Sequence, residues 1–240
     1  MSIIIEELFP EMCSLFGDGG NMRYLKLCLP EAEYKTTKLN DKPYFVDNDV
    51  DMIYMGPMTE HTQVLVIERL RPYKDRIEEL IQKGTVFLMT GNAHEVFGKS
   101  ITDTDGTVTE CLGINDFHAK RNMLKRFSGL VLGTYEDIEI AAFRAQFTEG
   151  FIGEGLEPFV KMTKGVPMNS DKKQFFEGYV RNNFFGTYLL GPLLILNPYF
   201  TEKLIVKLCG KKRTLAYETE VVRAYQARLE DFKDSRVGIH

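Results

Sequence analysis

A short apolar run at residues 86–89 (VFLM) follows a glycine and leads directly into a tight turn at residues 90–93. Apolar runs of this length are typical of buried strands in a parallel sheet. The residues after the turn predict a helix that runs toward Phe97. A sharp turn from such a strand into a helix is where α/β enzymes hold a nucleophile, because the turn raises one side chain above the sheet beside the N–H groups of the helix. The tip of this turn is Gly91, so the setting for a nucleophile is present without a nucleophilic side chain.

Length and composition restrict the class of protein. A chain of 240 residues with 44% hydrophobic and 27% charged residues predicts one soluble α/β domain over residues 1–240. The net charge of −4 gives no reason to expect nucleic-acid binding. The four cysteines lie far apart without a CxxC pair, which argues against a zinc site and a disulfide scaffold. We expect reduced, mostly buried cysteines in a cytoplasmic protein with no membrane span, metal or cofactor.

The order of apolar patterns predicts the fold class. Strands and helices alternate over the first 100 residues, and the following part is rich in strands, which predicts an α/β fold with a mixed, mainly parallel sheet flanked by helices. A hairpin is expected at residues 101–109, around the Asp-Gly turn at 105–106. Residues 17–20 (GDGG) are interpreted as a turn with a helix N-cap. The expected strands cover residues 2–9, 51–55, 86–89, 130–133, 138–143, 159–162, 175–180 and 184–190, and the expected helices cover 21–30, 59–70, 73–83, 198–208 and 217–232.

Several segments resemble a known family. Residues 15–21 (LFGDGGN) look like the LYGDxGN opening of the cobyric-acid-synthase-type class I glutamine amidotransferases, and residues 186–198 (GTYLLGPLLILNP) look like their GTYLHGPLLxxNP signature. Residues 51–57 lie where the family has a strand and a Gly-rich loop that supplies an oxyanion-hole amide, which places Gly56 in that loop. Residues 84–98 lie where it has the nucleophile elbow CGGYQxLG. The resemblance covers about residues 3–208. Within the family, the sequence looks most like the glutaminase subunit of lipid II isoglutaminyl synthase, which works with a Mur-ligase-like partner.

The resemblance implies a site that has lost its chemistry. In the family a Cys thiolate attacks the amide carbon of glutamine, and a His transfers the proton. Alignment on these motifs puts Gly91 at the Cys position and Leu190 at the His position. It puts Asn92 and Ala93 at the two glycines, and His94 and Glu95 at the Tyr-Gln pair. We therefore expect no glutaminase activity by the family mechanism, and a degenerate pocket formed by Gly56, Gly91, Asn92, Ala93, His94, Glu95 and Leu190.

Other side chains near the elbow have simpler interpretations. We interpret His94 as a partly exposed histidine at the helix start, and Glu95 as a carboxylate that stabilises the helix dipole. Cys111 is interpreted as a packed thiol. Arg144 and Gln146 depart from the family pattern and are expected to reshape the floor of the pocket. The backbone N–H groups of residues 91–93 could hold an anion or a carbonyl oxygen.

Two functions of different classes remain open. The first is a non-catalytic interaction or regulatory subunit, paired with a Mur-ligase-like or other synthetase subunit or with a second copy of itself. The second is an active amidotransferase or hydrolase that uses displaced catalytic groups, with Cys111 or His94 as the candidate suppliers. By resemblance, the pathway would be the amidation of cell-wall lipid II or a cobalamin-type synthesis.

Overall fold

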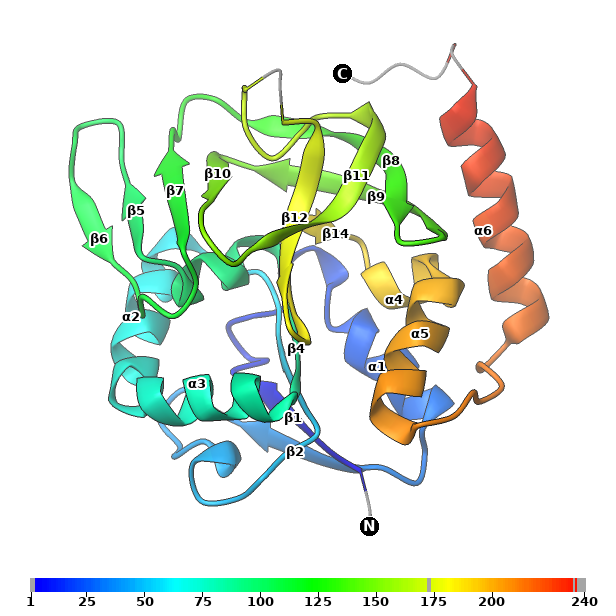
Figure 1. The fold of residues 1–240 in the computed structure, drawn as a ribbon, viewed down its shortest axis with the longest axis horizontal. Helices are drawn as coiled ribbons and strands as arrows, with labels where there is room; N and C mark the ends of the chain where they lie inside the picture. The colour runs from blue at the N-terminus through cyan, green and yellow to red at the C-terminus, as the bar shows by residue number, and fades with distance from the viewer. Residues whose placement is uncertain (1–2, 172–173, 235, 237–240) are drawn as a thin grey trace.

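Ten strands form one continuous sheet in the computed structural model, which describes residues 3–171, 174–234 and 236. The strands lie in the order β14-β9-β8-β11-β12-β13-β4-β3-β1-β2 (Figure 1). Their bounds are β1 Ile4–Leu8, β2 Glu33–Thr37, β3 Met52–Met55, β4 Val86–Thr90, β8 Phe127–Tyr135, β9 Ile138–Gln146, β11 Glu157–Gly165, β12 Phe176–Arg181, β13 Phe184–Thr187 and β14 Leu189–Leu190.

The sheet has a parallel half and an antiparallel half. Strands β2, β1, β3, β4 and β13 pair in parallel, whereas β14, β9, β8, β11, β12 and β13 pair antiparallel. The prediction of an α/β fold with a mixed sheet flanked by helices is therefore confirmed, but the sheet is not mainly parallel as expected, because four of its pairings are parallel and five are antiparallel. The parallel pairing is confined to the half that alternates with helices, because antiparallel neighbours need only short connections and parallel neighbours need crossovers.

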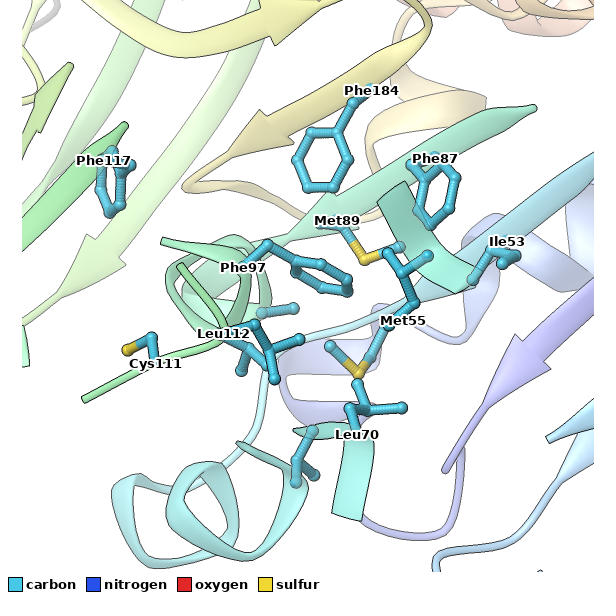
Figure 2. Packing of buried hydrophobic residues seen from close by; sticks show 14 of the residues in the cluster. Ile53, Met55, Leu70, Phe87, Met89, Phe97, Cys111, Leu112, Phe117 and Phe184 are labelled. Atoms are coloured by element: carbon cyan, nitrogen blue, oxygen red, sulfur yellow. The ribbon is translucent and has the colours of Figure 1, made fainter. Parts of the chain in front are cut away.

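Helices cover both faces of the parallel half. Strands β3 and β4 are buried on both faces, and their side chains alternate between two cores. Ile53, Met55, Phe87 and Met89 face the core under α2 and α3, part of which Figure 2 shows. Met52, Tyr54, Val86 and Leu88 face the core under α1 and α5. The helices are α1 Gly20–Cys28, α2 Glu60–Leu70, α3 Lys74–Lys83, α4 Leu193–Leu196, α5 Pro198–Cys209 and α6 Glu218–Lys233, with 3-10 turns η1 Leu15–Gly17, η2 Tyr44–Val46, η3 Arg71–Tyr73 and η4 Gly91–Phe97.

A smaller sheet packs beside the end of β4. Its order is β10-β7-β5-β6, from strands β5 Ser100–Thr102, β6 Val108–Glu110, β7 Phe117–Arg121 and β10 Thr148–Ile152. The predicted hairpin is present as the antiparallel pair β5 and β6, with Gly106 at φ +88° in its turn. Strands β7 and β10 have no counterpart among the expected elements.

The segment predicted as one strand over residues 184–190 is two strands. The backbone N–H of Tyr188 donates to Glu177 at 2.7 Å, and the N–H of Leu189 donates to the Thr187 hydroxyl at 3.1 Å. These bonds turn the chain at Tyr188. As a result β13 pairs with β4 in the middle of the sheet, and β14 pairs with β9 at its far edge. This crossing brings residue 190 to the end of β4.

Two further expectations concern the cysteines and the membrane. The cysteines are unpaired, as expected, with Cys13, Cys28 and Cys111 buried and Cys209 half-buried. Within the described ranges, no helix is both long and apolar enough to cross a lipid bilayer. The division of the chain into a single domain stays a prediction.

Candidate functional site

A pocket of about 210 Å³ opens where the parallel strands end. Its walls come from the segments that follow β1, β3 and β4, and from the end of β9, the start of β10, β14 and one residue before β8. Binding sites in α/β folds form at this edge of the sheet, because the loops after parallel strands meet there. The lining residues are Leu15, Phe16, Pro57, Met58, Thr59, Glu60, Gly91, Asn92, Arg126, Ala145, Gln146, Phe147, Thr148 and Leu190.

The tip of the elbow has no space for a side chain. Gly91 has φ +58°, and a Cβ atom built on it would lie 2.4 Å from the Pro57 Cβ. Real Cβ atoms do not approach that closely, and the positive φ adds strain for any L-residue. The predicted strand-turn-helix is present, but the helix is the 3-10 turn η4 of seven residues. The elbow is therefore closed from above by the loop that follows β3.

The Asn92 side chain ties the elbow to that loop. Its Oδ1 accepts from the Met58 N–H at 3.0 Å, and its Nδ2 donates to the Met58 carbonyl at 2.9 Å. Pro57 has no N–H to donate. The Asn92 carbonyl in turn accepts from the Gln63 side chain at 2.9 Å. The Met58 donor, which lies beside the pocket, is thus already engaged within the protein.

The opposite wall is formed by β9, β10 and β14. Leu190 is 2% exposed and pairs with Phe143 of β9. Gln146 lines the pocket as well, with its Nε2 donating to the Thr148 carbonyl at 2.5 Å and its buried Oε1 without a hydrogen-bond partner. The expectation that Gln146 shapes this pocket agrees with its position.

Of the seven residues predicted to form the pocket, three line it. Gly91, Asn92 and Leu190 come from separate motifs and meet there. The other four, Gly56, Ala93, His94 and Glu95, are buried and do not line it. Ala93, His94 and Glu95 lie behind the pocket because η4 turns inward, toward Phe117 of β7. Gly56 follows β3 and lies against Cys13, Tyr54 and Asp18.

His94 is fully buried, so its interpretation as a partly exposed residue is wrong. Its ring packs edge-on against Phe117, Tyr179 and Tyr188, with centroids 4.9, 5.4 and 4.2 Å away. Neither ring nitrogen has a hydrogen-bond partner. Burial, with the Arg144 charge as a second cause, lowers the pKa of His94 to about 3, so the ring is neutral at neutral pH.

Glu95 is also buried, at 1% exposure, and it lies beyond the first turn of η4, where a carboxylate would stabilise the helix dipole as predicted. Its carboxyl accepts from the Gln63 amide at 2.8 Å and from the Tyr188 hydroxyl at 2.8 Å. Arg121 donates to the Gln63 side-chain oxygen at 2.5 Å. Burial raises the pKa of Glu95, which those hydrogen bonds oppose. This chain of contacts joins η4 to α2, β7 and the β13–β14 bend.

Arg144 does not form the pocket floor, contrary to expectation. Its guanidinium is buried and donates to the carbonyls of Val166, Pro167, Met168 and Thr148. The cation also lies 5.2 Å from the centre of the Tyr188 ring. Arg144 thus links the segment before β12 to the sheet. A guanidinium has five N–H donors, so it can bind several carbonyls at once.

Sequence reasoning missed a buried carboxylate beside the elbow. Asp18 was interpreted as part of a capped turn, but the N-cap of α1 is Gly19, with no side-chain cap. The Asp18 carboxyl instead accepts from the hydroxyls of Tyr54 and Thr90, the residue before Gly91. Burial raises its pKa to about 6, opposed by hydrogen bonds, of which that from Thr90 is the largest. No periodic pattern could have shown this contact, because it joins the loop after β1 to the end of β4.

Glu177 is a second buried carboxylate that sequence reasoning did not single out. It accepts from the Thr187 hydroxyl at 2.5 Å and from the Tyr188 N–H at 2.7 Å, and so holds the bend that sends β14 across the sheet. Burial is the main cause that raises its pKa to about 7. Its signal in the sequence was its place in an otherwise apolar strand.

The candidate displaced groups lie away from the pocket. Cys111 is 4% exposed and lines a different hollow with Arg71 and Lys99, and burial raises its thiol pKa to about 12, which fits the predicted packed thiol. A hollow of about 620 Å³ between α5, α6 and the β8–β9 turn is larger than the pocket but contains none of the predicted site residues. Across the described part of the chain, no three His, Cys, Asp or Glu side chains gather as metal ligands do.

Comparison with known proteins gives a family and two curated relatives. A model of the CobB/CobQ-like glutamine amidotransferase domain matches residues 8–197. The glutamine-hydrolyzing lipid II isoglutaminyl synthase subunit GatD of Staphylococcus aureus is 26% identical over 217 residues, which cover 88% of this chain and 86% of that protein. The subunit of the same name from Streptococcus pneumoniae is 24% identical, over 87% of this chain and 81% of that protein.

Solved structures agree on the fold. A crystal structure of a glutamine amidotransferase covers 86% of this chain with a TM-score of 0.54 at 12% identity, and 99% of that chain is matched. A Thermotoga maritima glutamine amidotransferase covers 97% of this chain with a TM-score of 0.53 at 10% identity, and 93% of that chain is matched. At these identities the likeness shows the architecture alone.

Proposed function

This chain belongs to the CobB/CobQ-like glutamine amidotransferase family, and on that premise we propose that it is a non-catalytic interaction or regulatory subunit of a synthetase-like complex. The observation that carries the proposal is the contact between Gly91 and Pro57. Gly91, the residue aligned with the family nucleophile, has no side chain. A Cβ atom at this position would lie only 2.4 Å from the Pro57 Cβ.

Loss of the proton carrier supports the same proposal. A thiolate nucleophile needs a base that takes up and returns a proton. Leu190, aligned with the family His, lines the pocket with Gly91 and has only a hydrocarbon side chain. The two aligned positions belong to motifs about 100 residues apart, and their meeting in one pocket supports both assignments. Removal of either member of such a pair costs several orders of magnitude in rate.

Two backbone positions in the loop after β3 also have no free N–H for an oxyanion. A tetrahedral intermediate of amide hydrolysis needs free donors directed at the developing negative charge. By resemblance, the loop after β3 supplies one of them. In this chain that loop contains Pro57, which has no N–H, and Met58, whose N–H is bound by Asn92. The two loop residues that contact the elbow therefore offer no free amide.

Displaced catalytic groups have less support. Among the described residues that line the pocket there is no Cys, Ser or His. The Cys13 thiol contacts the Met58 sulfur at 3.9 Å from behind the wall, and burial raises its pKa to about 12. His94 is enclosed by three aromatic rings and is neutral. An activated thiolate beside a base has no candidate in this part of the protein.

The partner follows from the relatives. Both curated relatives are named as subunits of a glutamine-hydrolyzing synthase that acts on lipid II. We propose a cytoplasmic complex with a Mur-ligase-like or other synthetase partner, in lipid II amidation or a cobalamin-type pathway, and self-association as the other arrangement. In this complex the chain would contribute a fixed scaffold and no ammonia.

The test is an attempt to restore the missing chemistry. Ammonia release from glutamine is measured for the wild type, for Gly91→Cys/Leu190→His, and for the same double variant with Pro57→Gly. We expect no release by the wild type, alone or with a Mur-ligase-like protein encoded beside its gene. The triple variant should release ammonia or form a covalent adduct with an electrophilic glutamine analogue, because Pro57→Gly removes the atom that blocks a side chain at residue 91.

The matched control is the double variant that keeps Pro57. It has the same two catalytic groups without space for the thiol, so its gain should be much smaller than that of the triple variant. Glutamine-dependent ammonia release by the wild type, abolished by His94→Ala or Cys111→Ala, would contradict the proposal and favour a displaced mechanism.

A further inference from the structure

The turn between β7 and β8 presents two apolar side chains to solvent. Leu124 is 97% exposed, more than any other large apolar side chain of the described residues, and its neighbour Met123 is 48% exposed. The turn lies at the end of the molecule opposite the N-terminus (Figure 1). A single exposed leucine is common on protein surfaces, so exposure alone carries no conclusion. We call Met123 and Leu124 the apolar tip.

The backbone holds the apolar tip in this position. The Asn122 side chain accepts from the Leu124 N–H at 3.0 Å, and the Asn122 carbonyl accepts from the Lys125 N–H at 3.0 Å. The Asn122 N–H is itself bound to the Phe147 carbonyl at 2.8 Å. Residues 122–125 therefore form a fixed β-turn. Polar and small residues favour the two central positions of such turns, but here both are long and apolar.

Cations surround the apolar tip. Residues 120–127 (KRNMLKRF) contain four basic residues and no carboxylate, in a chain whose net charge is −4. Lys120, Lys125 and Arg126 are exposed, and each cation lies over an aromatic ring, at 5.1, 4.7 and 5.9 Å from its centre. The rings under Lys125 and Arg126 belong to Phe127 and Phe147, close to the turn, whereas Lys120 lies over Phe151, farther along the β7–β10 pair.

The charges that face this cluster leave it positive. Asp103 and Glu149 share a small hollow with Lys120, Arg121 and Lys125. Asp103 lies 3.6 Å from Arg121, which is buried, and Glu149 accepts from the Ser170 N–H at 2.7 Å. Within the described part of the chain, the three exposed cations around the tip therefore form no ion pair with a carboxylate.

We propose that the β7–β8 turn is a contact site for an anionic lipid surface. Met123 and Leu124 would enter the headgroup and acyl-chain boundary while Lys120, Lys125 and Arg126 bind lipid phosphates. Long apolar side chains beside a basic cluster are the two signals that hold peripheral proteins on anionic membranes. This inference does not depend on the loss of catalysis.

A lipid surface fits better than a protein surface. The cores of protein interfaces are depleted in lysine, and a stable interface needs about 800 Å² from each partner. A protruding two-residue tip with flanking lysines satisfies neither condition, but it can insert into a fluid surface that adapts to its shape. Because Arg126 also lines the pocket described above, together with Phe16, binding would bring the pocket mouth close to the headgroups.

Vesicle binding by the purified full chain tests the proposal. Cosedimentation is measured with phosphatidylcholine vesicles and with vesicles that contain about 30% phosphatidylglycerol, at low ionic strength. We expect binding to the anionic vesicles only. Met123→Ser/Leu124→Ser should weaken it at least tenfold. Lys120→Gln/Lys125→Gln should weaken it about 25-fold, because each cation near an anionic surface changes binding about fivefold.

The matched controls remove the same types of side chain from other parts of the surface. Leu27→Ser removes another exposed leucine, on α1, which is 56% exposed. Lys38→Gln/Lys211→Gln removes two exposed lysines elsewhere. Both should change binding less than twofold. All these positions are exposed and only Lys120 lies in a strand, and unfolding midpoints would verify that each variant is folded.

The absence of tryptophan gives a second readout. Leu124→Trp creates a single reporter whose emission should shift to the blue on anionic vesicles and be quenched by brominated lipids, whereas Leu27→Trp should not respond. The proposal is overturned if wild type does not prefer anionic vesicles or if the tip variants bind as well as wild type. It is equally overturned if the tip variants change the oligomeric state without lipid, since the turn would then contact protein.

Discussion

His94 is a polar ring in an apolar setting. Its two nitrogens are buried without hydrogen bonds, and three aromatic rings surround it. A neutral imidazole can be tolerated in such a place, but an imidazolium cannot, because burial removes its hydration. The histidine therefore makes the folded state sensitive to acid.

The sign of this sensitivity follows from linkage. The folded pKa of His94 is about 3 and the unfolded value is 6.5, so the unfolded chain takes up a proton first as the pH falls. His94 thus contributes stability above pH 6.5 that is lost progressively toward pH 3. Between about pH 7.5 and pH 5 this loss is roughly 2 kcal/mol. We predict that His94→Leu removes that part of the pH dependence, as measured by urea unfolding at both pH values.

The comparison between pH values separates titration from packing. Any packing lost in His94→Leu lowers the free energy of unfolding by the same amount at both pH values. Asp18 and Glu177, whose pKa values are raised to about 6 and about 7, act in the opposite direction and are present in both proteins. If the variant and wild type lose equal stability on acidification, His94 is not the acid-sensitive group.

The sequence predicted the positions of some site residues and not those of others. Gly91 and Leu190 could be identified as site residues because neighbouring motif residues fix their alignment. The burial of His94 and Glu95 could not be predicted, since a polar residue just after a turn is usually exposed. Tertiary contacts with the smaller sheet, the large sheet and α2 bury them. Pro57 was visible as a residue after a buried strand, but its contact with Gly91 depends on the register of β3 and β4.

At the scale of elements, the elbow after β4 and the loop after β3 form one closed unit. Gly91 at φ +58° fits beneath Pro57, and Asn92 binds Met58 through both atoms of its amide. The unit resembles a nucleophile elbow in topology, but its close packing replaces an open tip. Energetic coupling between residues 57 and 91 should therefore be measurable.

A double-mutant cycle on Gly91→Ala and Pro57→Gly tests this coupling. We predict that Gly91→Ala alone costs about 2–4 kcal/mol, from the left-handed backbone and the contact with the Pro57 Cβ. With Pro57→Gly the cost should fall to about 1–2 kcal/mol, because only the backbone term remains. Denaturant unfolding of the four proteins gives the coupling. Additive costs would mean that the loop moves aside freely.

Helices and strands were predicted correctly where nearby residues determine their ends, and they were missed where contacts between distant residues determine them. Thr59 caps α2 by accepting from the Thr62 N–H, and Gly210 ends α5 in the left-handed region, because threonine and glycine favour these positions. The break between β13 and β14 depends on Glu177, ten residues away on a neighbouring strand. Strands β7 and β10 have short, mixed sequences and form through pairing with each other.

At the scale of the whole molecule, the extent of the domain is still untested. The family model ends at residue 197, but α5 and α6 continue beyond it. Helix α6 stands at the edge of the molecule, next to α5 (Figure 1). Its apolar stripe packs on Leu132 and Ala141 of β8 and β9. The predicted single domain requires that this helix unfold together with the sheet.

Substitutions on the two faces of α6 test that requirement. On the buried face, Leu229→Ala and Tyr225→Ala should each lower the free energy of unfolding by about 2–4 kcal/mol, since Leu229 is 8% exposed and the Tyr225 hydroxyl donates to the Glu139 carbonyl at 2.6 Å. On the exposed face, Arg223→Ala should change it by less than about 0.5 kcal/mol. Circular dichroism and tyrosine fluorescence, followed in the same urea titration, should report one coincident transition for every variant. A helix that belongs to the core passes the loss of its contacts on to the whole domain. If helical signal is lost before the sheet unfolds, and Leu229→Ala does not change the later transition, α6 is instead an appendage that unfolds separately.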